Sequence, residues 1–178
     1  MKHILPILTI TTLAAAASAQ SAAAPAGLSY NRVSISREGQ NNSIAVSSFL
    51  GSSNVLATIS TNSLGGNGEN YTSLSVGYVF KNVAAGVDAT VGVTTGNASS
   101  NSAVTVNLRR ALNEVVSGLE VAVGASYSEK AGATAGANTV VTAELAYNIN
   151  KTWSVAYGIS NVNPPADVAH VVSVRHNF

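Results

Sequence analysis

Along most of this chain, apolar and polar residues alternate with a period of two, in one stretch after another. Residues 71–80 (YTSLSVGYVF) place Leu74, Val76, Tyr78 and Phe80 on one face and mainly small residues on the other. Because successive side chains of a strand point to opposite faces, this alternation predicts strands with one apolar and one polar face. The same pattern recurs at 84–93, 118–127, 139–149 and 153–160.

Weaker alternating runs bring the expected total to about ten strands; they lie at 28–36, 43–50, 55–61, 103–110 and 168–178. Short connections are expected at 51–54, 81–82 and 148–151, with a slightly longer one at 111–117. Longer ones, rich in Gly, Asn, Ser and Pro, are expected at 61–70, 95–102, 128–138 and 161–167. Alternating short and long connections predict an up-and-down antiparallel meander that closes into an all-β barrel. Eight strands with longer loops are the alternative.

The composition bears on which way the two faces point. Only 10% of the residues are charged, against about 25% in an average soluble domain. The polar face consists of Ser, Thr, Gly, Ala and Asn, which suit a narrow lumen better than a solvated surface. A transmembrane β-barrel with its apolar face outward is therefore expected, and a soluble periplasmic barrel or sandwich that binds a ligand is the alternative.

Aromatic residues gather near the ends of the expected strands. A membrane barrel carries such residues in two girdles, because an amphipathic ring is most stable at the level of the lipid headgroups. The expected girdle residues are Tyr78, Phe80, Tyr127, Tyr147, Trp153 and Tyr157.

The first residues have the layout of a secretory signal peptide. Lys2 and His3 precede an apolar run, and small residues at Ala17 and Ala19 fit cleavage before Gln20. We expect a signal peptide at 1–19, a short N-terminal segment at 20–27 and the barrel domain at 28–178. A second small-residue site around Pro25 leaves the cleavage position open by a few residues.

The last strand reads HVVSVRHNF and places Val172, Val174, His176 and Phe178 on one face. In this the chain resembles small bacterial outer-membrane β-barrel proteins, whose last strand ends in an outward-facing aromatic residue, usually Phe. His176 departs from the more usual Tyr or aliphatic residue. The resemblance implies an outer-membrane location and contact with outer-membrane lipid. It also implies that periplasmic chaperones and the barrel-assembly machinery read these residues as their signal. It names no single family within the class.

With the apolar face outward, strand parity places charged residues of both signs on the inner face: Arg32, Asp88, Arg109, Glu120, Glu144 and Arg175. Asp88, Arg109 and Glu120 are expected to form a lateral row whose members are joined by charge-assisted hydrogen bonds. The set either braces the wall or forms a constriction that selects small solutes.

The sequence lacks the residues that catalysis, metal binding or disulfide formation would need. The absence of Cys excludes disulfides, thiol catalysis and Cys-based zinc sites. Beyond the expected signal peptide, the two histidines, His170 and His176, fall on the lipid face and too far apart to share an ion. We therefore expect no enzyme, no metal and no cofactor, and the near-neutral charge argues against nucleic-acid binding. The expected role is structural or weakly porin-like, with a small-solute channel gated by the lumen charges as the alternative.

Overall fold

The computed structural model describes residues 28–63, 70–96, 99–129, 137–162 and 168–178. They form ten strands: β1 (Arg32–Glu38), β2 (Asn41–Phe49), β3 (Val55–Ser63), β4 (Asn70–Ala84), β5 (Val87–Gly96), β6 (Ser99–Ala111), β7 (Leu119–Glu129), β8 (Ala137–Asn148), β9 (Trp153–Val162) and β10 (Val168–Asn177). The expectation of about ten strands is confirmed, and the alternative of eight is wrong. The signal peptide and the segment 20–27 lie outside the described residues.

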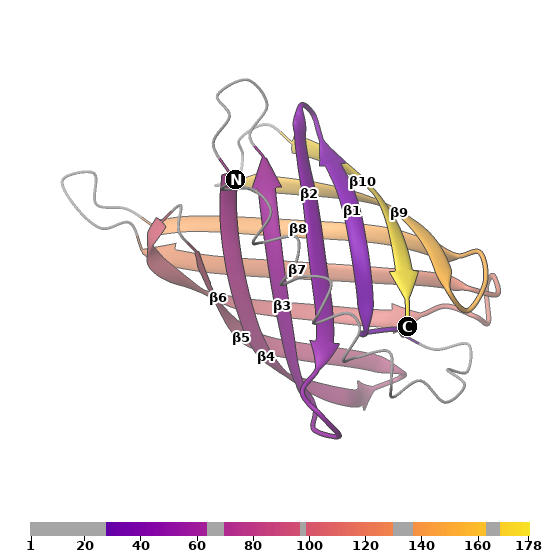
Figure 1. The fold of residues 1–178 in the computed structure, drawn as a ribbon. Helices are drawn as coiled ribbons and strands as arrows, with labels where there is room; N and C mark the ends of the chain where they lie inside the picture. The colour runs from indigo at the N-terminus through magenta and orange to yellow at the C-terminus, as the bar shows by residue number, and fades with distance from the viewer. Residues whose placement is uncertain (1–27, 64–69, 97–98, 130–136, 163–167) are drawn as a thin grey trace.

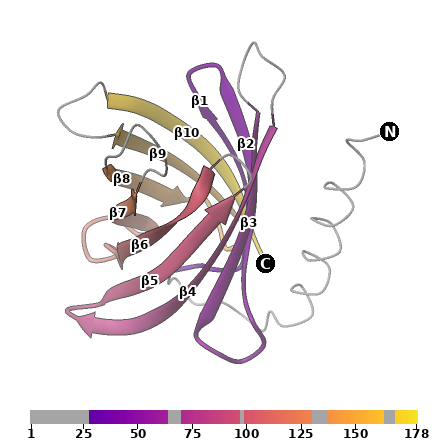
Figure 2. The ribbon, with the colours of Figure 1, turned by 90° about the vertical axis from the view of Figure 1, so that its left-hand side faces the viewer.

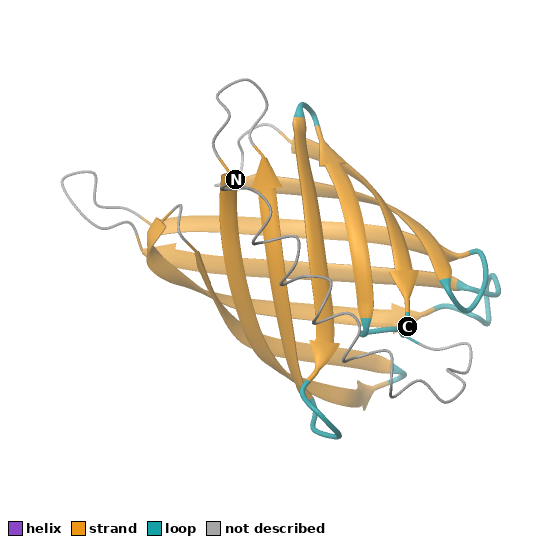
Figure 3. Ribbon diagram, viewed as in Figure 1, coloured by secondary structure: helices purple, strands orange, loops and turns teal. Residues whose placement is uncertain are grey.

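Each strand pairs with its chain neighbour in antiparallel register, and β1 pairs with β10 to close the ring. Figures 1 and 2 show the strands wrapping around one lumen, with indigo β1 beside yellow β10. Strands, drawn orange in Figure 3, make up most of the described chain, and the described loops and turns between them are drawn teal. Closure pairs the backbone groups of both end strands, so no strand edge is left open.

Side chains sort into the two faces that the alternation predicts. Ile35, Leu74, Val93 and Leu145 lie on the outer face and are between 43 and 59% exposed. The inner face carries Ser, Thr, Gly and Ala together with the charged residues described below. A soluble barrel needs the opposite arrangement, with the apolar face inside, and a sandwich has no closed ring. Neither soluble alternative fits this fold.

The connection after β4 differs from the expected turn at 81–82. The strand continues through a register irregularity between Phe80 and Ala84, and the turn consists of Ala85 and Gly86. Both residues have positive φ, 48° and 78°, as in the two-residue turn that matches the twist of antiparallel strands. The side-chain oxygen of Asn82 accepts a hydrogen bond from the Gly86 amide at 3.0 Å. The alternation alone carried no sign of this local irregularity.

The connections at the two ends of the barrel do not divide into short and long ones as the sequence predicted. Residues 50–54, 85–86, 112–118 and 149–152 join strands at the end where β1 begins and β10 ends. At the opposite end, β1 and β2 are joined by Gly39 and Gln40 alone. The long loop expected at 95–102 is wrong, because β5 extends to Gly96 and β6 already begins at Ser99. No helix among the described residues is long and apolar enough to cross a membrane.

Candidate pore-lining site

One half of the inner wall, from β1 to β5, is lined by hydroxyl groups. They pair across neighbouring strands, with oxygens 2.6 to 2.9 Å apart: Ser36 with Ser43, Ser47 with Thr58, Ser60 with Ser73 and Ser75 with Thr94. Each pair satisfies two polar groups without adding bulk or charge. These pairs make this half of the wall polar without large side chains, and its charged residues are Arg32 and Glu38 on β1 and Asp88 on β5.

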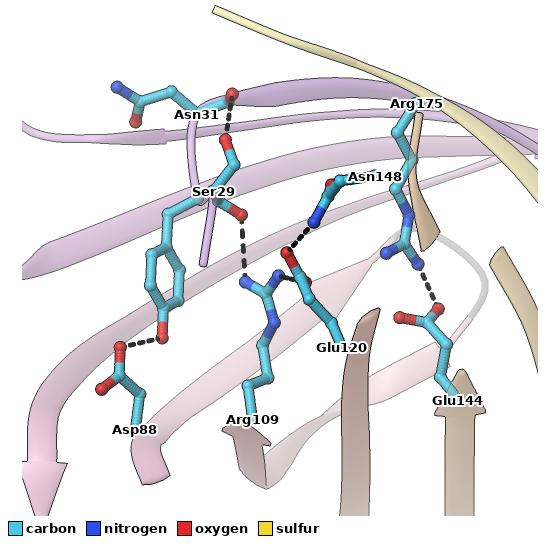
Figure 4. Close-up of polar contacts among 9 residues, drawn as sticks. Ser29, Asn31, Asp88, Arg109, Glu120, Glu144, Asn148 and Arg175 are labelled. Carbon is cyan, nitrogen blue, oxygen red and sulfur yellow. Dashed lines mark hydrogen bonds and ion pairs between the residues drawn. The ribbon is translucent and has the colours of Figure 1, made fainter. Parts of the chain in front are cut away.

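The other half of the wall carries the two lumen ion pairs, and Arg109–Glu120 is the pair in which both side chains are well buried. Arg109 Nη2 donates to Glu120 Oε2 at 2.8 Å, and the two side chains are 8% and 7% exposed. The second oxygen of Glu120 accepts from Asn148 Nδ2 at 2.7 Å. Figure 4 shows these side chains meeting inside the barrel. Both carboxylate oxygens are bonded, which a buried charge requires.

A second ion pair joins Arg175 on β10 to Glu144 on β8. Strand β9 lies between them, and Gly158 is the residue of β9 opposite Glu144. A Cβ at Gly158 would lie 3.7 Å from Glu144 Cβ and 3.2 Å from the Ala143 carbonyl oxygen. The close contact would therefore be with the backbone of β8, whereas the contact with the Glu144 side chain would be an ordinary one.

Asp88 does not join the expected row with Arg109, although the two residues are opposite each other in the β5–β6 register. One oxygen of Asp88 accepts from the Tyr30 hydroxyl at 2.8 Å and the other from the Asn82 amide at 2.8 Å. Arg109 turns instead to Glu120 and, through Nη1, to the Ser29 carbonyl at 3.1 Å. The row is therefore interrupted by residues that precede β1.

Tyr30 lies just outside the first strand and is 6% exposed. Burial, together with the hydrogen bond to the Asp88 carboxylate, raises the pKa of its phenol well above the usual value, although Arg109 opposes the shift. The phenol is therefore a neutral hydrogen-bond donor at physiological pH.

A cavity of about 260 Å³ lies within the lumen beside these charges. Arg32, Arg109 and Glu144 contribute charged groups to its wall, and Asn107, Thr142 and Ser160 contribute neutral polar ones. A space of this size holds several water molecules or one small solute. Among the described residues, Arg32 has no ion pair.

The structure thus places all six charged residues expected in the lumen on the inner wall, but it joins only four of them in ion pairs. Two inner residues were missed. Glu38 accepts from Ser160 at 3.3 Å, and strand parity with Arg32 would have found it had the first strand been extended past 36. Tyr30 lay inside the run expected at 28–36 and shares the parity of Arg32, but parity predicts only a face and not a contact across the lumen.

The six residues expected in the aromatic girdles lie on the outer face, each between 45 and 50% exposed. Tyr78 and Phe80 contact each other, with ring centroids 4.8 Å apart. Both histidines also lie on this outer face. Tyr157 is hydrogen-bonded to His170 Nδ1 at 2.6 Å, and the rings of Trp153 and His176 are nearly perpendicular, with centroids 4.9 Å apart.

The terminal strand closes the barrel. Val172 and Val174 face outward, 57% and 48% exposed. The backbone amide of Phe178 donates to the Asn31 carbonyl at 3.1 Å, so Phe178 is fixed against the start of β1. No group of three His, Asp or Glu side chains that could hold a metal ion occurs in the described part of the chain.

Comparison with known proteins supports the fold. The NanC porin structure aligns with a TM-score of 0.56 at 12% identity, over 83% of this chain and 98% of that one. The KdgM porin aligns with a TM-score of 0.49 at 14% identity, over 85% and 99%. The outer-membrane protein Omp33 of Acinetobacter baumannii aligns at 0.47 and 10% identity, over 85% and 100%. No protein-family model and no curated protein sequence matches the chain. The alignment with the NanC porin structure confirms the β-barrel fold.

Proposed function

We propose that this protein is an integral barrel of a bacterial outer membrane that passes small solutes weakly, in the manner of a narrow porin, and performs no catalysis. The observation that carries the proposal is the orientation of the two faces around a closed ring. The outer face is apolar, while the inner face is small, polar and charged, and it borders a cavity of about 260 Å³.

The apolar outer face argues for lipid as its surroundings. Water-soluble proteins rarely expose a continuous apolar band around their whole circumference. Exposed aromatics near both ends of the barrel, such as Trp153 at the start of β9 and Tyr127 near the end of β7, suit the two headgroup layers. On this proposal the chain is exported by its N-terminal segment and inserted with the help of chaperones and the barrel-assembly machinery. Val172, Val174, His176 and Phe178 would then serve as the assembly signal.

The inner face argues for weak conduction. Ten strands enclose a narrow lumen, whereas wide aqueous channels need about 16 strands or more. Two ion pairs, Arg109–Glu120 and Arg175–Glu144, lie along the inner wall of that lumen. Small ions and solutes fit beside them, and the pairs would bias which charge passes.

Planar-bilayer recording of the refolded mature chain tests this function. We expect small, discrete current steps, and we expect Arg175→Gln to shift the reversal potential in a KCl gradient toward cation selectivity. Arg110→Gln is the matched control, because the Arg110 side chain is 39% exposed and pairs with Glu114 outside the lumen. Wild-type recordings without steps would contradict weak conduction and favour a purely structural role.

A further inference from the structure

The residues that precede β1 fold across the mouth of the barrel at the end where β1 begins. We call Ser29, Tyr30 and Asn31 the N-terminal strap. Asn31 anchors it: its side-chain oxygen accepts from the Phe49 amide at 3.0 Å, and its carbonyl accepts from the Phe178 amide at 3.1 Å. The strap is therefore tied at its base to β2 and to the end of β10.

From this base, Tyr30 reaches strands on the far side of the lumen. In the closed ring, β1 neighbours β2 and β10, whereas β6 lies opposite β1. Tyr30 nevertheless donates to Asp88 on β5 at 2.8 Å. Its ring lies under the Arg109 guanidinium of β6, 4.7 Å from centroid to Cζ. The side chain thus spans the inside of the barrel.

Tyr30 is also held from the β2 side. The Phe49 ring contacts it at 5.1 Å between centroids, and Lys81 Nζ lies 4.9 Å from the centroid of Phe49. Figure 4 shows Arg109 pointing toward Ser29 of the strap, whose carbonyl accepts a hydrogen bond from the Arg109 guanidinium. Contacts from three strands leave the ring only 6% exposed.

The strap lies on one side of the cavity. The cavity is lined by Asn107, Thr142 and Ser160, which are farther along their strands from this mouth than Arg109, Asn148 and Ser154. A solute in the cavity that leaves toward this mouth therefore meets the charged residues and then the Tyr30 ring.

We propose that Tyr30 is the residue that limits permeation, because its ring closes the mouth of the lumen at the β1 end. This inference rests on the channel function proposed above. Passage then requires the strap to swing out, which breaks the hydrogen bond to Asp88 and the contact with Arg109 while the Asn31 anchor remains. The ion pairs of the wall set which charge is favoured, and Tyr30 sets how often passage occurs.

The absence of Cys from the chain permits a direct test with Tyr30→Cys. Removing the ring should raise the conductance of the refolded barrel severalfold. Reaction of the new thiol with a benzyl methanethiosulfonate should return the conductance toward the wild-type value, and dithiothreitol should raise it again. Tyr147→Cys is the matched control, since Tyr147 is 45% exposed on the outer face and neither substitution nor modification there should change conductance.

Each result has one reading. A Tyr30→Cys barrel that conducts like the wild type, or whose raised conductance the benzyl reagent leaves unchanged, overturns the inference while the channel function stands. A silent wild type with a conducting Tyr30→Cys barrel would overturn weak conduction by the native protein and support the strap as its barrier. Silence in both would overturn both proposals.

If Tyr30→Cys does not refold, Asp88→Asn replaces it. This change keeps the ring and weakens its hydrogen bond to the opposite wall, so brief, frequent openings are expected. A wild-type opening frequency in Asp88→Asn would then count against the inference.

Discussion

Arg109 Nη2 lies 2.8 Å from Glu120 Oε2 inside the barrel, and less than a tenth of either side chain is exposed. The pair joins β6 to β7 in a setting where neither charge has ready access to water. Removal of one partner from a buried ion pair leaves the other charge uncompensated and destabilises a protein by about 3 kcal/mol or more.

Arg109→Gln should therefore lower the free energy of unfolding by about 3 kcal/mol. Urea unfolding in lipid vesicles, followed by the fluorescence of Trp153, the only Trp in the chain, measures the change. Arg110→Gln breaks the neighbouring pair with Glu114, whose side chains are 39% and 54% exposed, and should change stability by about 0.5 kcal/mol or less. Equal effects of the two substitutions would show that the lumen pair is well solvated.

The buried phenol of Tyr30 predicts a dependence on alkaline pH. Its pKa is raised in the folded barrel by burial and by Asp88, so the stability it contributes is fully present below the ordinary tyrosine pKa of about 10. That contribution is lost as the pH rises from there toward the raised folded value. As the pH rises above about 10, the free energy of unfolding should therefore fall less for Tyr30→Phe than for the wild type.

An absorbance titration of tyrosinate checks this directly. Tyr30→Phe should leave the rise around the ordinary tyrosine pKa unchanged, because Tyr30 does not ionise there in the folded wild type. A smaller rise in Tyr30→Phe would show that the phenol is accessible and titrates normally.

The backbone of the turn between β4 and β5 is strained at Ala85, and a substitution there should relieve the strain. Ala85 has a φ of 48°, a left-handed conformation that costs a residue with a Cβ about 1–2 kcal/mol, whereas Asn and Gly tolerate it. Ala85→Asn should stabilise the barrel by about 1 kcal/mol in the same urea experiment. Ala84→Asn, one residue earlier and without positive φ, should bring no gain; a gain from both would point to a general effect of polarity.

The terminal strand predicts an effect on assembly in cells. Phe178→Ala should lower the amount of folded protein in the outer-membrane fraction severalfold, with the excess degraded or left in the periplasm. Phe80→Ala removes another aromatic residue, 48% exposed on the outer face, and should have a smaller effect. A normal amount of Phe178→Ala in the membrane would exclude Phe178 from the assembly signal.

The ten strands could be predicted because alternation is imposed on every residue that spans the wall. A chain between an apolar exterior and a narrow polar lumen has few exceptions to it, so strand parity also placed Arg32, Glu144 and Arg175 on one face. The side-chain contacts between neighbouring strands were harder to predict. Arg109 and Asp88 are opposite each other in register, yet each side chain takes another partner.

Tyr30 and the Ala85–Gly86 turn could not be predicted for the same physical reason. Their conformations depend on contacts between segments far apart in sequence, and Tyr30 and Asp88 are separated by 58 positions. Periodicity placed Tyr30 and the Ala85–Gly86 turn inside the strands expected at 28–36 and 84–93, because it predicts a face but neither the exact end of a strand nor a contact with a distant residue.

The central claim is that the chain forms a closed barrel surrounded by lipid or detergent. Gel mobility of the mature protein, purified from membranes and loaded with and without boiling, tests it most directly. We predict that the unboiled protein migrates as a compact, detergent-resistant species and that boiling shifts it to the position of the unfolded chain. Identical mobility in both samples, with the protein recovered in the aqueous fraction, would contradict the closed membrane barrel and every assignment of inner and outer faces.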